Sequence, residues 1–262
     1  MTMRRRWLRG HGARPFPVER HQVGDLRFQV RRSGQAGPDA VTFVLIHGLG
    51  MSHRSFSRLH RTLAGRDRAI SITLPGFGSI AKPARPVTVE EMAAALAALL
   101  DRLQVSTAVI VGQSMGTQWA IELAAQRPDL AAHVVAVGPV ADDRHRSLSA
   151  QMIALAIDSL RESPRTNAFV IADYVRCGPV WYLQQAKQML EYRIEDRAHS
   201  MQAPLLVVRG SRDPIAGRGW CRRLRAAAPG ASVAVVPGAA HHAQYFSPRA
   251  VAAAIRAFIT NA

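Results

Sequence analysis

The sequence predicts an α/β protein with a mostly parallel, eight-stranded sheet that carries helices on both faces and a helical lid insertion. Short apolar runs alternate with helical segments along most of the 262 residues, which is typical of a parallel sheet covered on both sides. Several of the runs are continuously apolar, as expected for strands that are buried on both faces. The stretch 141–200 contains no good strand, and a connection of that length usually carries structure of its own.

The N-terminal segment, 1–16, is basic and is not followed by an apolar run, so we expect a flexible tail and not a secretory signal. A hairpin follows, with strands at 19–23 and 26–32 around Gly24-Asp25. The other predicted strands are short and rich in valine, isoleucine and leucine. They are expected at 41–46, 68–74, 107–111, 133–137, 204–208 and 232–236.

The predicted helices carry apolar residues at helical spacing. The strongest prediction covers 88–103, where Thr88 and Glu91 have the spacing of a capping box. The others are expected at 54–64, 115–126, 147–160, 181–191, 219–228 and 248–259.

The strand-free stretch divides the predicted core in two. Two of the predicted helices fall within it, so we expect residues 141–200 to form a helical lid above the carboxyl edge of the sheet. The core is then built from residues 17–140 and 201–262.

The strongest chemical signal is Gly112-Gln113-Ser114-Met115-Gly116, which matches the pattern G-x-S-x-G. It stands between a predicted strand and a predicted helix, the context in which such a serine occupies a tight, strained turn. Glycines are needed at the flanking positions because side chains there would collide with neighbouring backbone. The turn lifts the hydroxyl clear of the sheet, and the start of the helix faces developing negative charge. We therefore predict that Ser114 is a nucleophile.

A serine hydroxyl needs a base, and the base needs an acid that orients it. In a strand–turn–helix arrangement of this kind the partners follow in the order Ser, Asp, His. Asp213 lies in a loop after the strand at 204–208, and His241-His242 follow the last strand. Both places are at carboxyl ends of strands, where open α/β sheets bind ligands. The sequence thus predicts Asp213 as the acid and His241 as the base.

From about Val41 to the C-terminus, the chain resembles the α/β-hydrolase superfamily. Four blocks in the expected order carry the resemblance: His47-Gly48-Leu49-Gly50-Met51, Pro75-Gly76-Phe77-Gly78, the Ser114 turn, and Asp213 with His241 and Pro248. The resemblance implies the α/β-hydrolase fold and an oxyanion hole formed by the backbone N–H groups of Leu49 and Met115. It also implies that His47 is structural and holds the loop that carries Leu49.

The family pattern also bears on two open alternatives. His241 has the expected spacing of seven positions to Pro248, which favours it over His242, although Ala240 stands where glycine is usual. Some family members place the acid after the preceding core strand, where this chain has Asp142-Asp143. Asp213 has the commoner G-x-x-D context, so we prefer it.

The expected substrate-binding residues are Gln113 beside the nucleophile, Phe169, Trp181 and Tyr182 in the lid, and His242 at the pocket edge. The predicted reaction is hydrolysis of a carboxylic ester, lactone or thioester of a small to medium apolar substrate through an acyl-enzyme. C–C bond hydrolysis, acyl transfer and perhydrolysis could use the same three residues. A non-catalytic ligand receptor on the same scaffold is the alternative from another class.

The net charge of +16 comes almost entirely from arginines that are scattered along the chain. No arginine-rich helix is interleaved with aromatic residues, so we expect no nucleic-acid partner. No apolar run approaches the length that spans a bilayer, so we expect no membrane partner. Cys177 and Cys221 are isolated in the sequence, which favours reduced thiols and a cytoplasmic location.

No cofactor or metal is expected. The segment 76–81 matches the pattern G-x-G-x-x-A of dinucleotide-binding turns, but Pro83 and Pro86 prevent the helix that this fingerprint requires. The sequence contains no metal-ligand spacing of histidines or cysteines. The expected partner is a small-molecule substrate, and the oligomeric state stays open.

Overall fold

The structure is a computed structural model, which describes residues 16–34, 37, 40–161, 164–228 and 230–261. The predicted tail lies outside this range except for Phe16. The Phe16 ring stacks on His60 with the ring centres 4.5 Å apart, and its carbonyl oxygen accepts a hydrogen bond from Arg31. Position 16 is therefore packed against the core.

Eight strands of the described chain form one sheet, in the order β1-β2-β4-β3-β5-β6-β7-β8. The β1–β2 and β2–β4 pairs are antiparallel and all other pairs are parallel, which confirms the predicted fold class. The bounds are β1 (Val18–Val23), β2 (Leu26–Ser33), β3 (Thr42–Ile46), β4 (Arg68–Thr73), β5 (Ala108–Gln113), β6 (Ala131–Val137), β7 (Leu205–Gly210) and β8 (Ser232–Val236).

The central strands are apolar on both faces because both faces are covered by helices. In β3, Val44 and Ile46 belong to one hydrophobic cluster, and Phe43 and Leu45 belong to a second. This alternation follows from the two-residue period of a strand. It explains why the sequence reads as a continuous apolar run.

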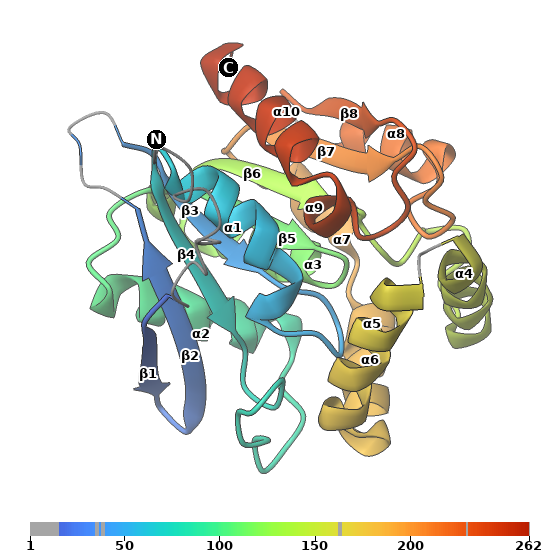
Figure 1. Ribbon diagram of the computed structural model, residues 1–262, viewed down its shortest axis with the longest axis horizontal. Helices are drawn as coiled ribbons and strands as arrows, with labels where there is room; N and C mark the ends of the chain where they lie inside the picture. Colours follow the sequence, from blue (N-terminus) through green and yellow to red (C-terminus); the bar gives the residue numbers. More distant parts are fainter. Residues whose placement is uncertain (1–15, 35–36, 38–39, 162–163, 229, 262) are drawn as a thin grey trace, which may run out of the picture.

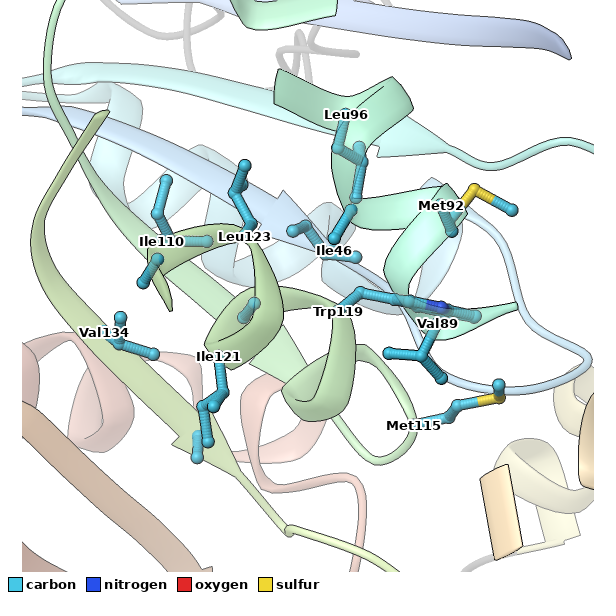
Figure 2. Packing of buried hydrophobic residues seen from close by; sticks show 14 of the residues in the cluster. Ile46, Val89, Met92, Leu96, Ile110, Met115, Trp119, Ile121, Leu123 and Val134 are labelled. Carbon is cyan, nitrogen blue, oxygen red and sulfur yellow. The ribbon is translucent and has the colours of Figure 1, made fainter. Parts of the chain in front are cut away.

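Helices α2 (Val89–Arg102), α3 (Gly116–Gln126) and α8 (Arg218–Ala227) cover one face of the sheet. The predicted capping box is present in α2: the Glu91 N–H donates to the Thr88 side chain, and the Thr88 N–H donates to the Glu91 carboxylate. Figure 2 shows Trp119 of α3 packed among apolar side chains of α2 and the sheet.

Helices α1 (Ser57–Ala64) and α10 (Pro248–Asn261) cover the opposite face (Figure 1). A short 3-10 helix, η1 (His53–Phe56), leads into α1. None of the helices described in the structure is long and apolar enough to cross a bilayer.

Four helices connect β6 to β7: the first three lie beyond the carboxyl ends of the parallel strands (Figure 1), and the fourth packs against α3 and α8 on one face of the sheet. We call them the inserted helices: α4 (Leu148–Arg161), α5 (Pro164–Cys177), α6 (Pro179–Glu191) and α7 (Ile194–His199). The sequence analysis identified α4 and α6 only. The segment that forms α5 is less apolar on average than α4 and α6, and α7 is too short to show a period.

Candidate active site

Ser114 occupies a strained turn between β5 and α3. Its φ of 56° is in the left-handed region, which residues other than glycine rarely adopt. A Cβ at Gly112 would lie 2.1 Å from the Gly116 carbonyl oxygen, and one at Gly116 would lie 2.3 Å from the Ile46 carbonyl oxygen. The glycines of the G-x-S-x-G pattern are therefore required by the close approach of backbone. The turn points Ser114 into a cavity at the carboxyl edge of the sheet.

His241 and Asp213 lie together at the ends of different strands. Nδ1 of His241 is 3.0 Å from Oδ2 of Asp213, and both side chains are buried. The other oxygen, Oδ1, accepts the backbone N–H groups of Ile215 and Ala216, each at 2.9 Å. A carboxylate can only accept, so Nδ1 of His241 carries the proton in this pair. Nε2 is then the nitrogen that can take a proton from elsewhere.

The surroundings of Asp213 keep it ionised. Burial by itself raises the pKa of a carboxyl group. At Asp213 this effect is outweighed by His241 and by the hydrogen bonds from Ile215 and Ala216, so that its pKa is lowered. An ionised Asp213 can both orient the imidazole and stabilise its protonated form.

The alternative acids and the alternative base have other contacts. Asp142 and Asp143 pair with Arg223 at 2.5 Å and 2.6 Å. Nδ1 of His242 lies 4.0 Å from Oδ2 of Asp158, and its ring meets that of His241 edge to face. The structure thus brings Asp213 and His241 together, as preferred.

His47 holds the loop that follows β3. Its Nδ1–H donates to the Gly48 carbonyl oxygen at 2.8 Å, and its Nε2 accepts the Leu74 N–H at 3.1 Å. Burial lowers the pKa of His47 to about 4, which keeps the ring neutral as this pairing requires. In the loop itself, the Met51 N–H donates to the Gly48 carbonyl oxygen at 3.2 Å.

The loop held by His47 passes close to the nucleophile. A Cβ at Gly48 would lie 2.7 Å from Cβ of Ser114. Leu49 lines the same cavity as Ser114, and Met115 directly follows Ser114 at the start of α3. The two N–H groups expected to form an oxyanion hole therefore both lie near Ser114: that of Leu49 on the loop after β3, and that of Met115 at the start of α3.

Ser114 and His241 line one cavity of about 50 Å³, which has room for about four water molecules. Its walls come from the loop after β3, the Ser114 turn, the loops after β7 and β8, and the inserted helices. The lining residues are Gly48, Leu49, Met51, Gln113, Ser114, Gln151, Leu155, Tyr174, Tyr182, Met189, Ile215, His241 and His242. None of these is a lysine, an arginine or a carboxylic acid.

Two of the expected substrate-binding residues lie away from this cavity. Phe169 stacks on Tyr245 with ring centres 5.2 Å apart and lies beside Arg54, in a separate cleft on the α1 side. Trp181 is buried against Phe77 and does not line the cavity. The other three, Gln113, Tyr182 and His242, are in the cavity wall.

The inserted helices also supply residues that the sequence analysis missed. Gln151 and Leu155 of α4 line the cavity. Asp158, three residues further on, accepts the His241 backbone N–H at 3.0 Å and is buried. Residues at this spacing share one helix face. In the sequence, the one signal that could have identified Asp158 is that it is the single acidic residue in a largely apolar predicted helix.

Tyr174 of α5, also missed, lies against Tyr182 of α6, with the ring centres 5.2 Å apart. Burial raises the pKa of both tyrosines. Among the residues that the structure describes, no group of three histidines, cysteines or acids could hold a metal ion.

A serine on a strained strand–turn–helix, beside a histidine–aspartate pair on a mostly parallel eight-stranded sheet, defines the α/β-hydrolase class. Residues 43–254 match the sequence model of the alpha/beta hydrolase family. The chain belongs to this family and is a hydrolase.

The chain is similar to several proteins over most of its length. It is 26% identical to the dihydrolipoyllysine-residue acetyltransferase component of the acetoin cleaving system of Pseudomonas putida, over 94% of this chain and 70% of that protein. It is 24% identical to the 2-(acetamidomethylene)succinate hydrolase of Mesorhizobium japonicum, over 93% and 95%. The crystal structure of an enol-lactonase from Burkholderia xenovorans LB400 has the same fold, with a TM-score of 0.79 at 21% identity, covering 92% of this chain and all of that one.

Proposed function

We propose that this hydrolase is a serine esterase or lactonase in which Ser114 is the nucleophile, His241 the base and Asp213 the orienting acid. One observation carries the proposal: His241, whose Nδ1–H is held by Asp213, lines the cavity into which Ser114 points. The strained backbone of Ser114 supports it, since strain of this kind persists where function needs it.

In the proposed reaction, Nε2 of His241 takes the hydroxyl proton of Ser114 as the oxygen attacks the substrate carbonyl. The negative charge that develops on the carbonyl oxygen is stabilised by the N–H groups of Leu49 and Met115. His241 then protonates the leaving alcohol, and the acyl group stays on Ser114. The imidazole next activates a water molecule, which releases the acid and restores the serine.

The cavity favours a small and uncharged acyl group. Its volume of about 50 Å³ admits only a few heavy atoms. Its lining has no lysine or arginine to pair with a carboxylate. The relative from Mesorhizobium japonicum is a hydrolase whose name specifies a succinate, and this uncharged lining argues against a dicarboxylate as substrate here.

The inserted helices form most of the outer wall of this cavity, through Leu155, Tyr174, Tyr182 and Met189. We propose that residues 141–200 act as a lid on the core formed by 17–140 and 201–262. A substrate larger than the cavity then enters only when these helices move away from the Ser114 turn.

The proposal is tested with Ser114→Ala and phenyl acetate as substrate. Because the variant has no nucleophile, we expect kcat to fall by at least about 10⁴-fold. A fluorophosphonate probe should label the wild type and leave the variant unlabelled. Equal melting temperatures would show that the variant is folded, and a folded variant that kept its activity would contradict the assignment.

A further inference from the structure

Gln113 is the last residue of β5 and directly precedes Ser114. Its side chain is fully buried and lines the cavity. Within the described chain, neither Nε2 nor Oε1 of this amide has a hydrogen-bond partner. The amide therefore presents an unused donor and an unused acceptor beside the nucleophile.

Two neighbouring polar side chains of the site, His47 and Asp213, are fully hydrogen-bonded. Both ring nitrogens of His47 and both carboxylate oxygens of Asp213 have partners. A buried amide without partners is unfavourable, and native proteins keep such groups where something outside the chain supplies the hydrogen bonds. The turn itself needs Gly112 and Gly116, but nothing in its backbone geometry requires an amide at position 113.

The amide lies close to the place of reaction. A Cβ built on Gly48 would be 2.9 Å from Oε1 of Gln113 and 2.7 Å from Cβ of Ser114. Both atoms thus face the same side of the Gly48 backbone. The amide is therefore near the position that a substrate carbonyl takes when Ser114 attacks it.

An amide edge carries one N–H donor and one carbonyl acceptor side by side. Its neutral complement is a group with the same two functions on one edge, which is a carboxamide. A carboxylate offers acceptors only, and the cavity wall has no cation to neutralise it. Other residues of the lining, such as Leu155 and Met189, are apolar.

We propose that the acyl part of the substrate carries a carboxamide next to the scissile carbonyl, and that Gln113 selects it by pairing with its donor and acceptor. This inference rests on the proposed serine-hydrolase function and names its substrate class. Gln113 is then the residue that distinguishes such acyl groups from plain alkyl ones.

The test compares two phenyl esters of equal shape, phenyl malonamate and phenyl 3-methylbutanoate. The readout is the ratio of their kcat/KM values, in which the intrinsic reactivity of each ester cancels between variants. Gln113→Met keeps the length of the side chain and removes the amide, so we expect the ratio to fall by about 10- to 100-fold. Gln113→Glu, which loses the donor, should lower it as well.

Gln126→Met is the matched control. Gln126 is a half-buried glutamine of α3 that does not line the cavity, and its amide donates to the Glu122 carboxylate and the Glu90 carbonyl oxygen. Its removal should leave the ratio unchanged.

Active sites are counted with the fluorophosphonate probe before each comparison. If the wild type is not labelled, the serine-hydrolase function itself fails. If the Gln113 variants are labelled as fully as the wild type and keep its ratio, water and not the substrate satisfies the amide, and the inference is overturned.

The wild type supplies a measurement that no folding defect can affect. Propanamide should inhibit competitively at lower concentration than butanone, which has the same shape without the N–H donor. Equal inhibition by the two would also overturn the inference.

Discussion

Asp213 illustrates how the position of a single residue defines its role. Asp142 and Asp143 also follow a core strand, yet their carboxylates pair with Arg223 at the surface. Asp213 is buried, accepts two backbone N–H groups and contacts Nδ1 of His241. Only this carboxylate can fix the imidazole tautomer that a serine nucleophile needs.

Asp213→Asn should therefore lower kcat by about 10³- to 10⁴-fold, because an asparagine can hold the imidazole in the wrong tautomer. Steady-state hydrolysis of phenyl acetate measures the effect. Asp142→Asn serves as the control and should change kcat by less than about 2-fold, since surface ion pairs contribute little. The reverse result, with Asp142 essential and Asp213 dispensable, would identify the other family arrangement.

Asp213→Asn should also change stability with pH. The pKa of Asp213 is lowered in the folded protein, so its ionised form stabilises the fold at pH values above the unfolded pKa of about 3.9. This contribution is lost as the pH falls through the folded pKa. In urea denaturation the variant should be less stable than the wild type at pH 7, and the difference should shrink in acid.

At the scale of elements, the core could be predicted from sequence because its constraints are local. The Ser114 turn needs two glycines, α2 has its capping box, and β3 reads as one apolar run. The inward faces of the inserted helices could not be predicted in this way. Helix α4 is apolar on both sides: Leu155 lines the cavity, whereas Ile153 and Leu160 are 62% and 88% exposed.

The positions of the aromatic residues in the inserted helices could not be predicted for the same reason. Phe169 and Tyr174 lie five positions apart on α5, and the orientation of that helix places Tyr174 at the cavity and Phe169 beside Tyr245. Orientation of this kind is determined by tertiary packing and leaves no period in the sequence. The substrate wall was therefore the least predictable part of the site.

Asp158 is the direct contact between α4 and the loop that carries His241. Asp158→Ala removes the acceptor of the His241 N–H, so we expect kcat to fall by about 10-fold as that loop becomes less well held. Asp158→Asn keeps an acceptor and should retain kcat within about 3-fold. Hydrolysis of phenyl acetate by both variants separates the hydrogen bond from the charge, and equal losses would contradict this role.

The charge of Asp158 should affect how the stability of the folded protein varies with pH. Burial raises the pKa of Asp158, so ionising this residue opposes folding at pH values above its folded pKa. Stability gained from protonation is present at low pH and is lost as the pH rises through that pKa. Asp158→Asn should therefore be at least as stable as the wild type at pH 8, measured by thermal unfolding, and this advantage should disappear in acid.

At the scale of the whole molecule, the strongly positive surface contrasts with the uncharged cavity wall. The chain has a net charge of +16, yet no lysine or arginine lines the cavity with Ser114. Exposed charges are screened within about 10 Å at 0.1 M salt. The surface charge and the proposed chemistry should thus be separable by ionic strength.

We therefore expect the protein to bind heparin at low salt and to elute at modest salt, because such binding depends on the release of counterions. Hydrolysis of phenyl acetate, a neutral ester, should change by less than about 2-fold over the same range, since there is no charge on the substrate to steer. Added heparin should not inhibit. A steep loss of kcat/KM with salt, or inhibition by heparin, would show that surface arginines take part in the reaction, and the uncharged cavity would then be an incomplete account of substrate binding.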